Sequence, residues 1–124
     1  MEADTKTILI VEDEPTNAEI ARIICERLGH HTLTATDGAE AIQLAHNQPI
    51  DLILMDILLP VKDGLEATRD LKDDPQTKDI PIIAVSARAS HHHRQEMLDA
   101  GMVDAIIKPY RSQELQDSIR KWLP

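Results

Sequence analysis

The stretch LILMDILLPVKDG, residues Leu52 to Gly64, places an aspartate directly behind a run of apolar residues. The four apolar residues Leu52–Met55 are typical of a strand that is buried on both faces. Asp56 follows at once, and Pro60 and Gly64 are residues that turn a chain. A core strand that ends on a negative charge carries that charge to an edge of the sheet, where other groups can meet it.

The same alternation of an apolar run with an amphipathic stretch recurs along the whole chain. Short β-branched runs predict strands, and apolar residues on one helical face predict helices. The predicted strands are Ile8–Val11, His31–Ala35, Asp51–Met55, Ile80–Ala87 and Val103–Lys108. The predicted helices lie within Glu12–His31, Asp37–Gln48, Gly64–Asp79, Ala89–Gly101 and Ser112–Leu123. Strict alternation implies helical crossovers, and therefore a doubly wound α/β fold with a five-stranded parallel sheet and five helices.

Capping signals indicate where several of these helices begin and end. Pro15 suits the first turn of a helix. Asp37 is a predicted N-cap, and Glu40 stands three residues later, as in a capping box. Gly101 is expected to end the fourth helix, and Ser112 is expected to cap the last one.

Length and composition predict one globular domain. The chain has 124 residues, 42% of them hydrophobic, with no Phe, one Tyr and one Trp, so the core is expected to be aliphatic. We predict a single domain over residues 1–124, with its core at about 6–122 and no effector domain. The segment His31–Ala35 is the most polar of the predicted strands, and we place it at an edge of the sheet.

The charge of the chain excludes some classes of partner. The net charge is −9, from 22 acidic against 13 basic residues, which argues against binding nucleic acid or an anionic membrane. No apolar run reaches the length of about 18 residues that a spanning helix needs. The one cysteine, Cys25, has no partner for an internal disulfide, and we expect the protein in the cytoplasm.

Polar residues follow four of the predicted strands. Glu12 and Asp13 come after the first strand, Asp56 after the third, Ser86 near the end of the fourth, and Lys108 at the end of the fifth. In an open parallel sheet, ligands bind beyond the carboxyl ends of the strands. If the first and third strands pair, we expect the carboxylates to be neighbours and the serine and lysine to lie on the same edge.

Such a group of residues has a chemical use. Neighbouring carboxylates repel one another unless a proton or a metal ion offsets their charge, and oxygen ligands suit Mg²⁺. A metal ion, an ammonium and a hydroxyl around Asp56 would form a site for phosphoryl transfer, with Asp56 as nucleophile. A lone aspartate after a strand, as Asp56 is when taken alone, is usually a helix cap or a solvated turn residue, and the acidic run Glu12–Glu14 could serve only the following helix. The joint pattern favours the site.

The motifs VEDE, LILMDILLPVKDG, VSA and IKPY, in this order and spacing, resemble those of response-regulator receiver domains. The resemblance covers Lys6 to Trp122 and implies a flavodoxin-like sheet of strand order 2-1-3-4-5. It implies that Asp56 accepts a phosphoryl group from a phosphohistidine, and that Ser86 and Lys108 contact that group. A cis bond between Lys108 and Pro109 is also implied.

The resemblance further implies a cofactor. Mg²⁺, with Mn²⁺ as an alternative, would be bound by Glu12, Asp13, Asp56 and the backbone carbonyl of Leu58. This chain carries Glu12 where the family more often has aspartate, and Ala105 where it often has an aromatic switch residue.

The implied partners are proteins. A histidine kinase or histidine phosphotransferase would dock on the first helix, near Asn17 and Ile20, and a downstream protein would read the phosphorylated state. The resemblance leaves open a monomer or a phosphorylation-linked dimer. It describes a signalling phosphoacceptor rather than an enzyme, with Mg²⁺-dependent self-phosphorylation and autodephosphorylation.

Other interpretations of the sequence were weighed. The chain could be a receiver domain cut from a hybrid histidine kinase or a multidomain response regulator. A phosphatase of the haloacid dehalogenase type is disfavoured, because VEDEP lacks the DxDxT or DxDxV spacing of that class. The run His91–His93 favours a solvated helix start over a metal site, because consecutive helical residues point about 100° apart.

Overall fold

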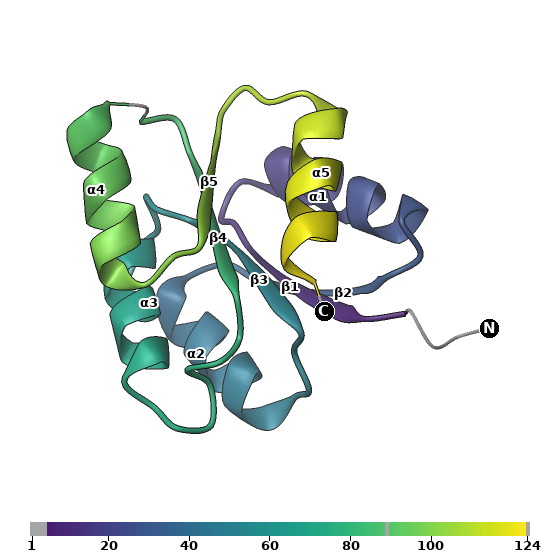
Figure 1. Cartoon of the computed structure of the whole chain (residues 1–124). Helices are drawn as coiled ribbons and strands as arrows, with labels where there is room; N and C mark the ends of the chain where they lie inside the picture. Colours follow the sequence, from purple (N-terminus) through teal and green to yellow (C-terminus); the bar gives the residue numbers. More distant parts are fainter. Residues whose placement is uncertain (1–4, 89, 124) are drawn as a thin grey trace.

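Strands and helices alternate strictly through residues 5–88 and 90–123, the part of the chain that the computed structural model describes (Figure 1). The elements are β1 (Thr7–Val11), α1 (Pro15–Arg27), β2 (His31–Ala35), α2 (Gly38–Asn47), β3 (Leu52–Asp56), α3 (Gly64–Lys72), β4 (Ile82–Ser86), α4 (His91–Ala100), β5 (Asp104–Ile107) and α5 (Ser112–Trp122). The two ends of the predicted domain, residues 1–4 and 124, lie outside the described residues, as does Ala89 at the start of the fourth predicted helix.

The strands form one parallel sheet in the order β2-β1-β3-β4-β5. This confirms the predicted doubly wound α/β fold and its strand order. β2 is at an edge, as its polar sequence predicts, and four of its five residues are partly or fully exposed. Among the described residues, no helix is both long enough and apolar enough to cross a membrane.

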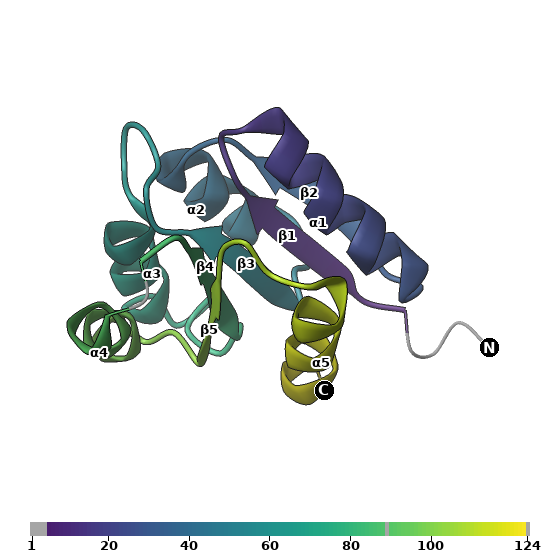
Figure 2. The ribbon, with the colours of Figure 1, turned by 90° about the horizontal axis from the view of Figure 1, so that it is seen from above.

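Helices cover both faces of the sheet, and a separate core lies under each layer (Figures 1 and 2). α1 and α5 pack on one face, against Ile8, Ile10 and Leu54. α2, α3 and α4 pack on the other face, against strand residues such as Leu9 and Ile53. Successive strand residues point to opposite faces, so runs that are apolar at every position supply both cores.

Most helix ends follow the predicted signals, with one correction. Asp37 caps α2, and Gly101 ends α4 with a φ of 110°. The prediction that Ser112 caps the last helix is wrong, because Ser112 is the first residue of α5 and Arg111 is its N-cap. The carboxylate of Glu114 accepts a hydrogen bond from the backbone nitrogen of Arg111 at 3.1 Å, which fixes the boundary one residue earlier.

Candidate functional site

The carboxyl ends of β1, β3, β4 and β5 meet at one edge of the sheet, which Figure 2 shows from above. Asp56 is the last residue of β3 and Ser86 is the last residue of β4. Glu12 directly follows β1, and Lys108 directly follows β5. Parallel strands in this order therefore bring four chemically active side chains from distant parts of the sequence to a single rim.

Three carboxylates converge at this rim. Oxygen atoms of Glu12, Asp13 and Asp56 lie within 4.8 Å of one another. Glu12 and Asp56 are 8% and 9% exposed, whereas Asp13 is exposed to solvent. Placing like charges this close is unfavourable unless cations offset them, and burial strengthens the repulsion.

Lys108 is the cation that faces these carboxylates. Its Nζ lies 2.8 Å from Oε1 of Glu12 and 3.2 Å from Oδ2 of Asp56. Burial on its own would lower the pKa of Lys108, but the hydrogen bond to Glu12 and the charges of both carboxylates outweigh it and raise that pKa. The ammonium therefore stays charged, and it faces two carboxylates while Asp13 lies close beside them.

Ser86 lies at the end of β4, beside β3 and β5, and within the described part of the chain no hydrogen bond joins its hydroxyl to the carboxylates. Its side chain is 1% exposed, and its hydroxyl accepts a hydrogen bond from the backbone nitrogen of Arg88 at 3.0 Å. The backbone nitrogen of Lys108 donates to the carbonyl of Ser86 at 2.8 Å, which keeps the ends of β4 and β5 together. The peptide bond between Lys108 and Pro109 is cis, as predicted.

The loop after β3 folds tightly against the end of its own strand. The backbone nitrogen of Leu58 donates to Oδ1 of Asp56 at 3.3 Å, and that of Gly64 donates to the carbonyl of Ile57 at 2.9 Å. A Cβ atom at position 64 would lie 2.0 Å from the carbonyl oxygen of Asp56. Glycine is therefore required here by close backbone approach, since any side chain would push the loop off the site.

The donor set of this rim fits a hard divalent cation. It offers carboxylate oxygens only, and Mg²⁺ and Mn²⁺ prefer such ligands in proteins. Within residues 5–88 and 90–123, these three side chains are the one group of His, Cys, Asp and Glu that could hold a metal ion together. The side chains of His91–His93 do not form a second group there: His93 contacts Ser90.

Most of the chain matches a known protein family. The model of the response regulator receiver domain family matches residues 8–120.

The chain belongs to the response regulator receiver domain family.

Similar proteins agree with this assignment. The polar-differentiation response regulator DivK of Brucella ovis is 39% identical over 119 residues, which are 96% of this chain and 97% of DivK. The receiver domain of the sensor histidine kinase PA1611 from Pseudomonas aeruginosa, solved with a magnesium ion in its active site cleft, is 38% identical with a TM-score of 0.88, covering 95% of this chain and 97% of that one. The chemotaxis response regulator CheY4 of Vibrio cholerae has a TM-score of 0.91 at 25% identity, covering 96% of this chain and 99% of that one.

Two further predicted positions of this receiver domain lie beside the acidic rim. Asn17 is half-buried on α1, and Ile20 is 46% exposed on the same helix. Ala105 lies in β5, where it packs at the border of the core under α4. The receiver domain therefore has an exposed apolar residue next to its site, and only a methyl group at position 105.

Some contacts of the site were not foreseen from the sequence. The sequence placed Lys108 beside the carboxylates, but it did not indicate that the shorter contact of its ammonium is with Glu12. The hydrogen bond that Ser86 accepts from Arg88 was also missed. Both depend on side-chain placement between separate strands and loops, which residue spacing does not report.

Proposed function

We propose that this receiver domain is the phosphoacceptor of a two-component system or phosphorelay, and that Asp56 is the residue phosphorylated. The observation that carries the proposal is the contact of the Lys108 ammonium with Glu12 and Asp56, with Asp13 within 4.8 Å. A structural ion pair needs one carboxylate per ammonium. Two carboxylates in contact with one lysine, and a third carboxylate beside them, favour a site that gains further positive charge and then a phosphoryl group.

Asp56 is the nucleophile in this proposal. One carboxylate oxygen attacks phosphorus in a partner phosphohistidine. The O–P bond forms as the N–P bond breaks, and the imidazole leaves with the electron pair of that bond. When bound, Mg²⁺ would be held by Glu12, Asp13 and Asp56, with the Leu58 carbonyl as a fourth protein ligand, and would neutralise charge on the phosphoryl oxygens.

Lys108 and Ser86 would stabilise the phosphorylated form. Lys108 already points at Oδ2 of Asp56, so its ammonium can exchange the carboxylate of Glu12 for a phosphoryl oxygen. The hydroxyl of Ser86, which now accepts a hydrogen bond from the backbone nitrogen of Arg88, would instead donate a hydrogen bond to a phosphoryl oxygen. This movement of Ser86 is a local change from which the loop after β4 could relay the signal to α4 and β5, although Ala105 offers no ring to turn.

The surfaces next to the site support the proposed protein partners. We propose that a histidine kinase or histidine phosphotransferase docks on α1, where Ile20 is exposed and Asn17 lies one turn nearer the acidic rim. A downstream protein would bind elsewhere, and Leu98 on the outer side of α4 is an exposed apolar residue available to it. We expect a signalling domain in the cytoplasm rather than an enzyme with its own substrate.

A phosphorylation assay tests the proposal. Incubation with acetyl phosphate or phosphoramidate and Mg²⁺ should add one phosphoryl group to the native chain, read by intact mass, and a chelator should prevent it. Asp56→Asn should remain unmodified. Asp51→Asn is the matched control at the opposite edge, where Asp51 accepts a hydrogen bond from the backbone of Thr7 at 2.8 Å, and it should be modified like the native chain. Equal modification of both variants would refute the assignment of Asp56.

A second candidate concerns the context of the domain. The similarity to a receiver domain of the sensor histidine kinase PA1611 favours a receiver that works inside a longer kinase. The similarity to DivK, of which this chain covers 97%, favours a free-standing regulator. The proposed chemistry at Asp56 is the same in both, and we propose the free-standing regulator.

A further inference from the structure

The loop between β3 and α3, residues 57–63, is fixed against the start of α2 by a backbone contact. The backbone nitrogen of Gly38, the first residue of α2, donates to the carbonyl of Lys62 at 3.0 Å. Figure 2 shows this loop beside α2. The loop that follows Asp56 is therefore held, near its far end, by a helix from another part of the chain.

Position 38 has no room for a side chain. A Cβ atom at Gly38 would lie 2.3 Å from the carbonyl oxygen of Lys62 and 3.0 Å from the Cβ atom of Ala67 in α3. Gly38 is buried, so an added methyl group would have no solvent to turn toward. The carbonyl of Lys62 would have to move by about 1 Å to reach ordinary contact distance. A larger residue at position 38 would therefore displace the loop after β3.

The chain makes a tight turn just before this contact. The backbone nitrogen of Lys62 donates to the carbonyl of Pro60 at 2.7 Å, around Val61, whose φ is 63°. A three-residue turn with a positive φ at its centre is strained, and such strain persists only where the surrounding structure fixes the backbone. The side chain of Val61 is 86% exposed and does not anchor the turn. The contact with Gly38 and the ion pair of Lys62 with Asp70 are restraints that hold it.

The start of the same loop is fixed to its own strand. The carbonyl of Ile57 accepts the hydrogen bond from the backbone nitrogen of Gly64, and the side chain of Ile57 is buried. Leu58 lies between the two restraints, and its side chain is 55% exposed, so packing of that side chain does not place its backbone. The position of the Leu58 carbonyl therefore depends on the restraints at the two ends of the loop, and Gly38 supplies one of them.

We propose that Gly38 is a positioning residue for Mg²⁺ binding, because its contact with Lys62 holds the loop where the Leu58 carbonyl can reach the metal ion. The inference rests on the proposed function, in which that carbonyl is a ligand. Mg²⁺ requires near-ideal octahedral geometry, whereas Ca²⁺ accepts a flexible arrangement of ligands. A displaced loop should therefore weaken the binding of Mg²⁺ more than that of Ca²⁺. A general loss of stability would not distinguish the two ions.

The test compares Gly38→Ala with Gly29→Ala. Mg²⁺ and Ca²⁺ are titrated separately into the metal-free full chain, and each Kd is measured by calorimetry. Gly38→Ala should raise the Kd for Mg²⁺ about tenfold, as the loss of a group that supports a metal ligand usually does, and the Kd for Ca²⁺ by less than about threefold. Gly29 has a φ of 92°, and an added Cβ there would meet no atom within 4 Å beyond its chain neighbours. Gly29→Ala should lower stability and leave both Kd values unchanged.

A second measurement uses the native chain alone. Coupling between two sites is reciprocal, so Mg²⁺ should stabilise the contact that positions its ligand. The amide hydrogen of Gly38 should therefore exchange with solvent about tenfold more slowly when Mg²⁺ is bound, as followed by NMR. The amide of Gln76, which donates to Oδ1 of Asp74 at 2.8 Å in the loop after α3, is the control and should exchange at the same rate with and without the ion.

The results separate this inference from the proposed function. A native chain that binds no Mg²⁺ and is not phosphorylated would refute both. If the native chain binds Mg²⁺ and is phosphorylated at Asp56, the positioning role of Gly38 alone is refuted by either of two results. One is a Gly38→Ala variant whose Kd values for the two ions change equally, not at all, or no more than those of Gly29→Ala. The other is exchange at Gly38 that does not respond to Mg²⁺, and this result decides the inference if Gly38→Ala does not fold.

Discussion

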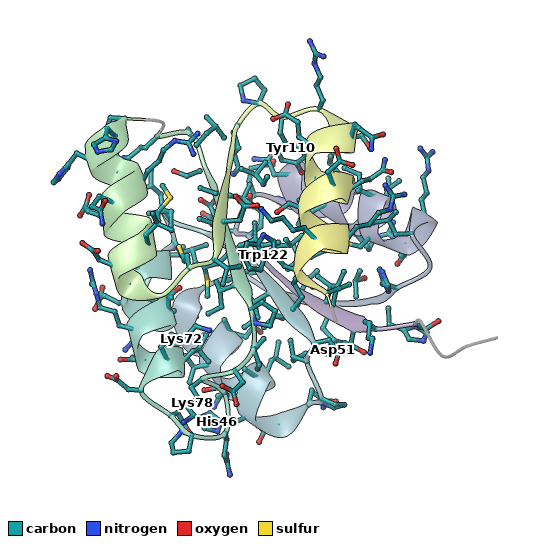
Figure 3. All side chains as sticks on the ribbon, viewed as in Figure 1. His46, Asp51, Lys72, Lys78, Tyr110 and Trp122 are labelled. Carbon is teal, nitrogen blue, oxygen red and sulfur yellow. The ribbon has the colours of Figure 1, made fainter. Side chains whose placement is uncertain are left out.

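Two lysines at opposite ends of the sheet lie in contrasting environments in this receiver domain. Lys108 faces the carboxylates of Glu12 and Asp56, which raise its pKa against the effect of burial. Lys72, which Figure 3 labels at the far end from Tyr110, donates to the carbonyls of Lys78 and Ile80 at 2.9 and 2.7 Å. Burial lowers the pKa of Lys72. Lys108 therefore pairs with carboxylates, whereas Lys72 joins the loop after α3 to the end of that helix.

The carboxylates show the same contrast. At the far end, Asp104 accepts hydrogen bonds from the hydroxyl of Ser118 at 2.8 Å, the indole of Trp122 at 3.1 Å and the backbone of Ala105 at 2.8 Å. Every one of these donors is neutral, and both oxygens of Asp104 accept hydrogen bonds. At the rim of the candidate site, one ammonium contacts two carboxylates, and a third carboxylate lies beside them. Of these two groups, only the one at the candidate site brings several negative charges together.

Replacing each lysine by methionine should have the largest effect on this comparison. Lys108→Met leaves two buried carboxylates without a cation, and the free energy of unfolding should fall by about 2–3 kcal/mol. Lys72→Met loses two hydrogen bonds but also removes a half-buried charge, and should cost about 1 kcal/mol. Urea denaturation at pH 7 in the presence of a chelator measures both.

The pH dependence gives this prediction its control. The pKa of Lys108 in the folded protein lies above its ordinary value of 10.5, so its stabilisation should be complete below pH 10.5 and be lost as the pH rises through the folded pKa. The pKa of Lys72 is shifted downward, and its contribution should instead rise with pH just below 10.5. Equal losses for the two variants at pH 7 would contradict the contrast between them.

Asp104→Asn should have the next largest effect, because it weakens a carboxylate that accepts three hydrogen bonds. Burial acts to raise the pKa of Asp104, but the bonds from Ser118, Ala105 and Trp122 outweigh it and lower that pKa below 3.8. Its stabilisation should be complete above pH 3.8 and be lost as the pH falls through the folded pKa. At pH 7 we expect a loss of about 1–2 kcal/mol in urea denaturation.

An exposed aspartate on the same helix as Trp122 provides the comparison for that variant. Asp117 is exposed, and Asp117→Asn should change the free energy of unfolding by less than about 0.5 kcal/mol. If Asp104→Asn lowers the free energy of unfolding no more than Asp117→Asn does, the hydrogen bonds from Ser118 and Trp122 to Asp104 do not stabilise the packing of α5 on β5.

A smaller effect is expected in the loop beside Asp56. Val61 has a φ of 63° and is 86% exposed, and the backbone nitrogen of Lys62 donates to the carbonyl of Pro60 at 2.7 Å around it. A β-branched residue is strained in this left-handed region, whereas asparagine tolerates it. Val61→Asn should therefore raise the free energy of unfolding by about 0.5–1 kcal/mol in the same denaturation assay. A loss of stability would mean that the loop carries no strain at this residue.

Signals within a few residues of one another predicted much of the fold. The N-cap Asp37 and the terminal Gly101 were identified correctly because their effects are local. The polar sequence of β2 placed it at the edge, because burial of an inner strand requires apolar residues on both faces. Ser112 misled the prediction because the competing signal, the carboxylate of Glu114, bonds one residue earlier.

The residues of the candidate site could be named from sequence because strand ends in a parallel sheet meet at one edge. Their individual contacts could not be predicted in the same way. The pairing of Lys108 with Glu12 and the bond between Trp122 and Asp104 join residues 96 and 18 positions apart. Their geometry is set by the packing of whole elements, which the spacing of residues does not encode.

The central claim is that crowded carboxylates at one rim are stabilised by a divalent cation. Thermal denaturation of the native chain and of Asp13→Asn, each with a chelator and with about 10 mM Mg²⁺, tests it most directly. Asp13→Asn should melt above the native chain in chelator, because one repelling charge is gone, and Mg²⁺ should raise the Tm of the native chain more than that of the variant. A native Tm that does not respond to Mg²⁺, or a variant that melts below the native chain in chelator, would contradict the account.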